Sequence, residues 1–167
     1  MLLLQRSLGR GTAEDRMRFE GRCHCGNLEV TFETSQPAAG IPLRECACSF
    51  CRRHGSTAVA DPAGRLEVRA RVAAEVSPYR FGLRTADFLV CRICGVFVAA
   101  VCDVGGATYA TLNCNVLEAR ERFTQSPARV NYDGETADER IARRRRVWTP
   151  AVVRGWRAPA SPPMEPG

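Results

Sequence analysis

Short runs in which apolar and polar residues alternate occupy the middle of the chain. From Leu28 to Glu33 the alternation has a period of two, which is typical of a strand with one buried face. Gly, Pro, Asn or Asp bounds each such run and favours a turn there. Further strands are predicted at residues 66–69, 75–81, 87–90, 96–101 and 108–112. Their spacing predicts a mainly β domain of antiparallel strands.

One helix is predicted near the C-terminus. Thr136 and Glu139 have the spacing of a capping box, and residues 140–147 follow without a helix breaker until Pro150. Residues 1–16 show no periodicity, and Met17 could be a second start. We therefore expect a dispensable extension at residues 1–16, one domain at residues 17–148 and a disordered tail at residues 149–167.

Length and composition fit a single globular domain. The chain has 167 residues, of which 45% are hydrophobic. No run of about 18 apolar residues is present, and the apolar stretch at Leu2–Leu4 is shorter than the core of a signal peptide. These features predict a cytoplasmic protein with no membrane partner. In that reducing compartment, closely spaced cysteines indicate metal sites more than disulfides.

Seven of the nine cysteines form three clusters. Cysteines that are one or two residues apart cannot easily form a disulfide with each other, but they can direct their sulfurs at one metal ion. Soft thiolate ligands favour zinc, copper(I) or iron–sulfur clusters. The clusters are Cys23 and Cys25, then Cys46, Cys48 and Cys51, then Cys91 and Cys94.

The two cysteine pairs together supply four ligands. A shell of Cys23, Cys25, Cys91 and Cys94 would be a closed, structural type of zinc site that joins segments about 65 residues apart. Glycines beside both pairs suit tight turns. A single multinuclear cluster or an iron–sulfur centre could use the same sulfurs, although no run has the ferredoxin spacing.

The middle cluster, Cys46, Cys48 and Cys51, has three ligands and no obvious fourth. Three protein ligands with one exchangeable position are typical of a catalytic zinc site. The isolated Cys102 and Cys114 could complete it, but such cysteines are more often small buried hydrophobic residues. His54 could be a proton carrier, a spare ligand or an ordinary turn residue. We expect His24 to point away from the metal.

The three cysteine clusters resemble, in order and spacing, those of the glutathione-dependent formaldehyde-activating enzyme and centromere protein V family. The matching motifs are Gly-x-Cys-x-Cys-Gly at residues 21–26, Cys-x-Cys-Ser-x-Cys-Arg at residues 46–52 and Cys-x-x-Cys-Gly at residues 91–95. Residues 55–56, 112–118 and 132–134 and the predicted helix are also similar to the family pattern. The resemblance covers residues 17–148.

The resemblance implies a mainly β, Mss4-like (β-tent) fold with a short C-terminal helix and two zinc ions per chain. It implies a structural zinc on Cys23, Cys25, Cys91 and Cys94, and a labile or catalytic zinc on Cys46, Cys48 and Cys51. The family's named activity is that of a carbon–sulfur lyase, which joins glutathione to formaldehyde as S-hydroxymethylglutathione.

The residues after the middle cluster could bind such a substrate. Arg52 and Arg53 could pair with the carboxylates of glutathione, with His54 beside them. Alternatively, the two arginines could simply screen the charge of the thiolates. The sequence thus favours a zinc-dependent enzyme whose partners are a small thiol and an aldehyde; it leaves the true substrates and the oligomeric state open.

The main alternative is a non-catalytic, zinc-folded binding module. All 24 basic residues are arginines, and residues 140–167 carry seven of them against one glutamate. An arginine-rich helix could contact the phosphates of a nucleic acid. Consecutive arginines on a helix, however, face in all directions, and the rest of the chain is close to neutral. We therefore do not expect nucleic acid as a partner.

Overall fold

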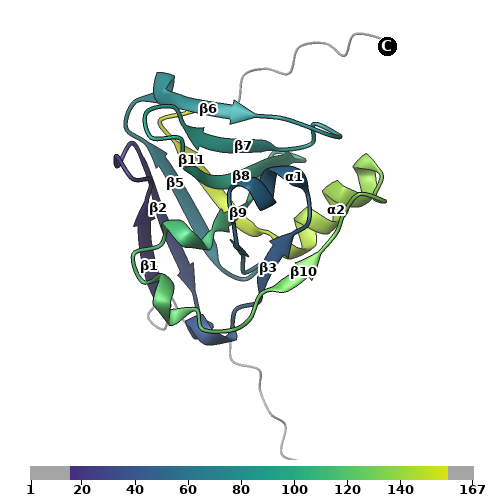
Figure 1. Ribbon diagram of the computed structural model, residues 1–167, viewed down its shortest axis with the longest axis horizontal. Helices are drawn as coiled ribbons and strands as arrows, with labels where there is room; N and C mark the ends of the chain where they lie inside the picture. The colour runs from purple at the N-terminus through teal and green to yellow at the C-terminus, as the bar shows by residue number, and fades with distance from the viewer. Residues whose placement is uncertain (1–15, 158–167) are drawn as a thin grey trace, which may run out of the picture.

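The computed structural model describes residues 16–157, which form one large mixed β-sheet with two short helices (Figure 1). The helices are α1 (Ser49–Arg53) and α2 (Ala137–Val147). Single 3-10 turns are η2 (Ala38–Gly40), η3 (Ala73–Glu75), η4 (Cys114–Val116) and η5 (Arg120–Arg122). The strands are β1 (Met17–Arg22), β2 (Leu28–Thr34), β3 (Leu43–Cys46), β4 (Ala58–Val59), β5 (Arg65–Ala70), β6 (Val76–Tyr79), β7 (Asp87–Cys91), β8 (Phe97–Val104), β9 (Ala107–Asn113), β10 (Ala128–Val130) and β11 (Thr149–Arg154).

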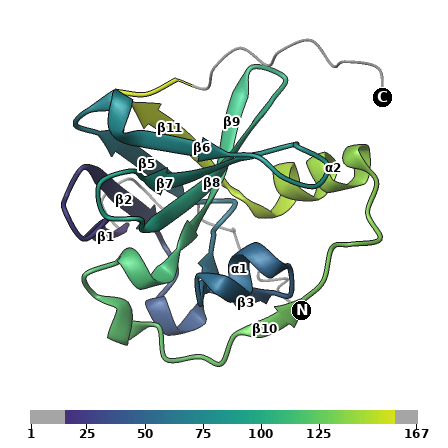
Figure 2. The ribbon, with the colours of Figure 1, turned by 45° about the horizontal axis from the view of Figure 1, so that its top comes forward.

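Strand β9 is the point where the sheet divides. One edge of β9 pairs with β8, which continues to β7 and β6. Its other edge is shared, because Ala110 pairs with β11 whereas Leu112 pairs with β4. From β11 the sheet runs to β5, β2 and β1, and from β4 it runs to β3 and β10. Three wings of the sheet therefore meet at β9. Helix α1 lies beside β3 (Figure 2), whereas α2 packs against β8 and β9.

The burial of the strands follows the hydrophobic pattern. In β2, Leu28, Val30, Phe32 and Thr34 are buried while the residues between them are partly exposed. Strand β8 differs, because all residues from Phe97 to Cys102 are buried. It separates two cores: the larger one lies among the main strands, and the smaller one includes Phe97, Ala100, Cys102 and Trp148. A strand buried on both faces cannot show a period of two.

The predicted elements are found, with several additions. Each of the six predicted strands is present, and α2 begins at the capping box of Thr136 and Glu139. Most strand pairs are antiparallel, but β11 runs parallel to β5 and β10 parallel to β3. Strands β1, β3, β4 and β10 and helix α1 were not predicted, since they are short or lack a clear period.

The predicted tail at residues 149–167 needs correction. Helix α2 ends at Val147, before Pro150, and residues 149–154 form β11 in the interior of the sheet between β5 and β9. Pro150 lies opposite Tyr109, where β11 meets β9. The remainder of the predicted tail from residue 158, and residues 1–15 of the predicted extension, lie outside the described residues. No helix among the described residues is long and apolar enough to cross a membrane.

Candidate metal centres

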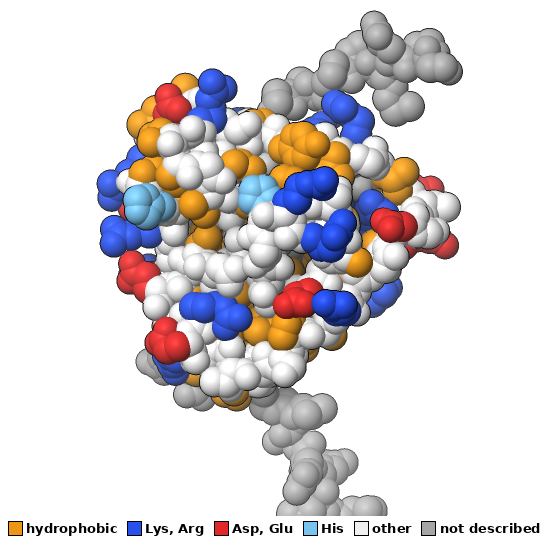
Figure 3. All heavy atoms as spheres, viewed as in Figure 1, with side chains coloured by type: hydrophobic (Ala, Val, Ile, Leu, Met, Phe, Trp, Pro, Cys, Tyr) orange, Lys and Arg blue, Asp and Glu red, His pale blue; other side chains and the backbone are white. Residues whose placement is uncertain are grey.

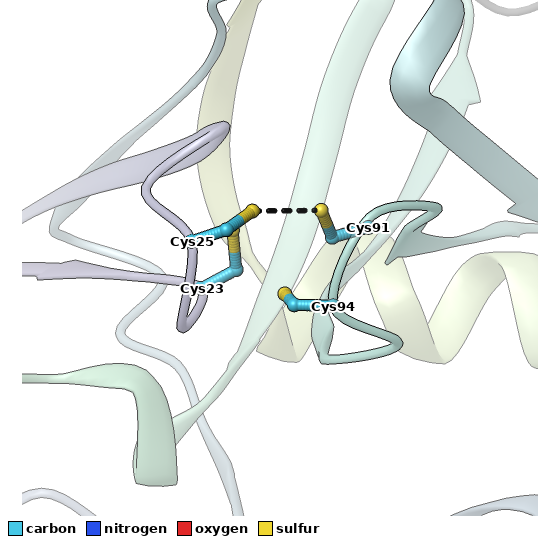
Figure 4. A group of neighbouring side chains, drawn as sticks. All are labelled: Cys23, Cys25, Cys91 and Cys94. Carbon is cyan, nitrogen blue, oxygen red and sulfur yellow. Dashed lines mark hydrogen bonds between the residues drawn. The ribbon is translucent and has the colours of Figure 1, made fainter.

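The four paired cysteines come together from two turns on different wings of the sheet. Cys23 and Cys25 lie in the turn between β1 and β2, whereas Cys91 ends β7 and Cys94 lies in the turn to β8. Their sulfurs face one another (Figure 4) and all lie within 4.8 Å. The Sγ atom of Cys25 is 3.7 Å from that of Cys23 and 3.4 Å from that of Cys91. Sulfurs about 2.3 Å from a tetrahedral metal lie about 3.8 Å apart, so this group could hold one metal ion.

Backbone amides support the sulfurs of this four-cysteine group. Gly26 and Gly95 have φ values of 80° and 73°, which let both turns close tightly. The amide of Leu28 donates a hydrogen bond to Cys23 Sγ at 3.2 Å. Burial opposes ionisation of Cys94, but hydrogen bonds from the amides of Cys25 and Val96 outweigh it and lower the pKa of Cys94 to about 6. Such amide donors favour thiolates, the form that binds metal.

The middle cysteines form a second group around α1. Cys46 ends β3, Cys48 is the N-cap residue of α1, and Cys51 lies within the helix. Their three sulfurs also lie within 4.8 Å of one another, so this three-cysteine group could hold a second metal ion. The amide of Cys51 donates to Cys48 Sγ at 3.4 Å, so a thiol takes the capping role usual for Ser, Thr, Asp or Asn.

The three sulfurs share charge unequally. Hydrogen bonds from the thiols of Cys46 and Cys51 lower the pKa of Cys48 to about 2. Hydrogen bonding to Cys46 and Cys48, together with burial, raises the pKa of Cys51, and the hydrogen bond to Cys48 raises the pKa of Cys46. The group therefore favours one thiolate among three sulfurs. A bound cation would allow all three to ionise.

The two cysteine groups differ in their surroundings. A cavity of about 110 Å³ is bordered by Cys46, Cys48 and Cys51, but by none of the four paired cysteines. That volume exceeds the space needed for one water, about 10–15 Å³, several times over. The aromatic side chains in the cavity lining are Phe81, Phe88, Phe97, Tyr132 and Trp148. The three-cysteine group therefore adjoins a space that could admit a small molecule.

Helix α2 turns a row of arginines toward this cavity. Arg140, Arg143 and Arg144, with Val147, line it at the i, i+3, i+4, i+7 spacing of one helix face. Arg145 and Arg146 are exposed. The spacing of the inward arginines was visible in the sequence. That spacing did not predict a buried face, because a buried helix face is normally recognised by apolar residues and this one is charged.

Arg140 and Arg143 have an acidic partner. Glu135 accepts two hydrogen bonds from Arg143, at 2.6 and 2.8 Å, and lies 3.4 Å from Arg140. The hydrogen bonds from Arg143 are the main reason that the pKa of Glu135 is lowered. Arg143 also lies over the ring of Tyr132, with its guanidinium carbon 3.5 Å from the ring centroid. These contacts anchor the loop before α2 to the helix.

Arg52, Arg53 and His54 occupy a different position from the cavity arginines. All three are exposed, and none lines the cavity. Arg53 donates to the carbonyl of Ser49, and His54 packs on Phe50 with their ring centroids 4.4 Å apart. His54 does not belong to either cysteine group. The predicted role of these three residues in binding glutathione stays a prediction, since the lining of the cavity lends it no support.

The remaining cysteines and His24 lie apart from both groups. Cys102 and Cys114 are buried in the two hydrophobic cores, which confirms the expectation of small buried hydrophobic residues. His24 is exposed and outside the four-cysteine group, as expected. A fourth protein ligand for the three-cysteine group is not found among residues 16–157.

Comparison with protein-family models and with curated proteins finds no match. Among solved structures, the chain is similar to a Rhodobacter sphaeroides protein whose crystal structure comes from structural genomics, with 32% sequence identity and a TM-score of 0.52. The match covers 66% of this chain and 99% of that one. The description of that structure names no activity. The chain therefore belongs to the same family as this Rhodobacter sphaeroides protein.

Proposed function

We propose that this protein is a zinc-dependent enzyme of the carbon–sulfur lyase type, built on an Mss4-like fold, that acts on the adduct of a thiol and an aldehyde. The observation that carries the proposal is the position of the three-cysteine group at the wall of a cavity. The sequence motifs that resemble the formaldehyde-activating family supply the reaction class. S-hydroxymethylglutathione is the adduct that this resemblance names.

The two cysteine groups fit zinc in two different ways. Cys23, Cys25, Cys91 and Cys94 would form a closed shell, which is typical of a structural ion. Cys46, Cys48 and Cys51 would hold a second ion and leave one position for a small molecule. When bound there, zinc supplies a Lewis acid that lowers the pKa of a thiol or polarises an aldehyde oxygen.

The reaction forms one bond between the thiol sulfur and the carbonyl carbon, and the thiol proton ends on the former aldehyde oxygen. The reverse reaction breaks the same bond. The aromatic walls at Phe88, Phe97 and Trp148 would exclude water from this exchange. The three arginines of α2 that line the cavity, Arg140, Arg143 and Arg144, would attract and orient an acidic substrate.

The nucleic-acid-binding alternative gains no support. Three of the five arginines in α2 line the cavity, which leaves Arg145 and Arg146 exposed on the helix. On the face seen in Figure 3, basic and acidic side chains are interspersed, without a continuous basic surface. A phosphate backbone is normally bound by a continuous basic patch.

The proposed activity can be tested by exchange NMR with formaldehyde, glutathione and their adduct. With a catalytic amount of zinc-loaded protein, we expect exchange faster than the spontaneous reaction, because the three-cysteine group and the cavity would hold both reactants together. Cys51→Ser should lose this acceleration, while Cys102→Ser, a change outside both groups, should retain it if the protein folds.

Equal exchange rates for the wild-type protein, Cys51→Ser and buffer would contradict the proposed activity on this substrate pair. Zinc content and a melting curve for each variant would show that the comparison is made between folded proteins. A mobility shift with duplex DNA that disappears at high salt would instead favour the binding module.

A further inference from the structure

The cavity contains a buried arginine with no acidic partner. Arg144 is 5% exposed and makes no ion pair with any acidic residue between positions 16 and 157. Its Nη1 donates to the carbonyl and the hydroxyl of Thr85, at 2.7 and 2.6 Å, while its Nε is buried without a hydrogen-bond partner. A buried charge is normally paired, because removing it from water is costly.

The contacts of Arg144 fix its position but leave its charge uncompensated. Its guanidinium carbon lies 4.8 Å from the ring centroid of Trp148, and the Cys102 thiol is a further neighbour. Ring, thiol and hydroxyl groups are neutral partners. Arg140 and Arg143 differ, since Glu135 already neutralises part of their charge. Arg44 also lines the cavity without an ion pair to any described residue, but it is partly exposed, so water can solvate its charge. Arg144 is thus the buried cavity arginine with the greatest need of an anion.

The size and lining of the cavity restrict that anion. Its volume of about 110 Å³ is below the range of about 300–1,000 Å³ that is usual for pockets binding drug-sized ligands. Phe81, Phe88, Phe97 and Trp148 present apolar surface. Glutathione is a tripeptide with two carboxylates and an ammonium group. It suits this small cavity and its apolar walls less well than a short apolar chain with one carboxylate.

We propose that the cavity selects a compact thiol, or its aldehyde adduct, that carries a single carboxylate on a short apolar body. The carboxylate pairs with Arg144, the body contacts the aromatic walls, and the sulfur faces the three-cysteine group. This substrate class rests on the proposed function and narrows it, because glutathione becomes a poorer ligand than a small mercapto acid.

Calorimetric titration of the zinc-loaded, full-length protein tests the proposal. The probes are 3-mercaptopropionate, its methyl ester, which lacks the charge, and glutathione. We expect the acid to bind at least about tenfold more tightly than the ester, since charge-assisted hydrogen bonds in a buried site contribute on that scale. The acid should also bind more tightly than glutathione.

Substitutions on α2 test whether Arg144 causes the preference for the acid over the ester. Arg144→Met should bind the acid and the ester alike, whereas Arg145→Met, which removes an exposed arginine from the same helix, should match the wild-type protein. Arg144→Lys keeps the charge and should retain a smaller preference for the acid. It also serves as the informative variant if Arg144→Met fails to fold.

Equal binding of acid and ester by the wild-type protein would overturn the proposal. The proposal would also be overturned if Arg144→Met still bound the acid more tightly than the ester, or if Arg145→Met lost this preference as fully as Arg144→Met. A folded Arg144→Lys with no preference for the acid would overturn it as well. Because the readout is binding, it is separate from turnover. A carboxylate preference without accelerated exchange between formaldehyde and 3-mercaptopropionate would contradict the proposed function alone. Accelerated exchange without the preference would contradict the substrate class alone.

Discussion

At the scale of single residues, the nine cysteines serve three structural roles. Four form a group that joins two turns, three lie beside a cavity, and Cys102 and Cys114 fill hydrophobic cores. Spacing along the chain separates the clustered cysteines from the isolated ones. The difference between the two clustered groups depends on what surrounds them. The three-cysteine group borders the cavity, whereas the four-cysteine group does not, although its Cys25 is exposed at the surface.

This difference predicts unequal effects of removing one sulfur. Cys94→Ser breaks the proposed closed zinc shell and should leave unfolded or insoluble protein, because the ion there contributes to folding. Cys48→Ser should leave a folded domain that holds about half the zinc. Melting curves recorded beside zinc analysis measure both effects. If Cys48→Ser unfolds the domain as severely as Cys94→Ser, the assignment of a structural and an accessible site is wrong.

At the scale of secondary-structure elements, α2 combines a strong start signal with an unusual buried face. The Thr136 hydroxyl accepts from the amide of Glu139 at 3.3 Å, and the Glu139 carboxylate accepts from the amide of Thr136 at 2.8 Å. Those bonds satisfy amides at the first turn that would otherwise lack partners. The helix they begin then presents Arg140, Arg143 and Arg144 to the cavity.

Removal of this cap should destabilise the protein measurably. Thr136→Ala is expected to lower the free energy of unfolding by about 1 kcal/mol, because both bonds of the capping box depend on the threonine or its geometry. Urea denaturation of the zinc-loaded protein provides the measurement. Thr124→Ala, at an exposed threonine outside helices and strands, should change stability by less than about 0.5 kcal/mol. Equal losses in the two variants would argue against the cap.

At the scale of the whole molecule, the four-cysteine group connects two wings of the sheet whose strand pairing joins at β9. Cys23 and Cys25 follow β1, on the wing that also contains β2 and β5, whereas Cys91 and Cys94 flank the β7–β8 turn of another wing. A metal ion there would be a cross-link between the two wings. It would stabilise the fold in the way that a structural zinc stabilises other small domains.

Metal removal should therefore proceed in two steps. Protein purified without chelator is expected to contain two zinc ions per chain by elemental analysis. A weak chelator should remove first the ion held by three cysteines, without loss of structure, and a strong chelator should then remove the second and unfold the domain. Circular dichroism during the titration follows the fold. The prediction of two zinc ions would be wrong if the protein contained iron and sulfide or no metal. The two-step order would be wrong if the domain unfolded when the first ion was lost.

Much of the strand pattern and the three cysteine clusters could be predicted from local sequence. The alternation in β2 and the cap of α2 are signals within a few residues of one another, and closely spaced cysteines limit which sulfurs can share an ion. Strands β3, β4 and β11 lacked such signals. Each gains its stability from neighbours distant in sequence, as β11 does from β5 and β9.

The sequence by itself determined a mainly β domain, the position of its C-terminal helix and the three clusters of seven cysteines. The tertiary structure decided that the two pairs form one group apart from Cys46, Cys48 and Cys51. Only the tertiary structure decided that the three-cysteine group borders a cavity and that Arg144, rather than Arg52 or Arg53, lies in its wall. The physical reason is the range of the interactions. Strand alternation and helix caps act between near neighbours, whereas a cavity forms where β3, β8, β9 and α2 pack together, and no local pattern encodes that meeting.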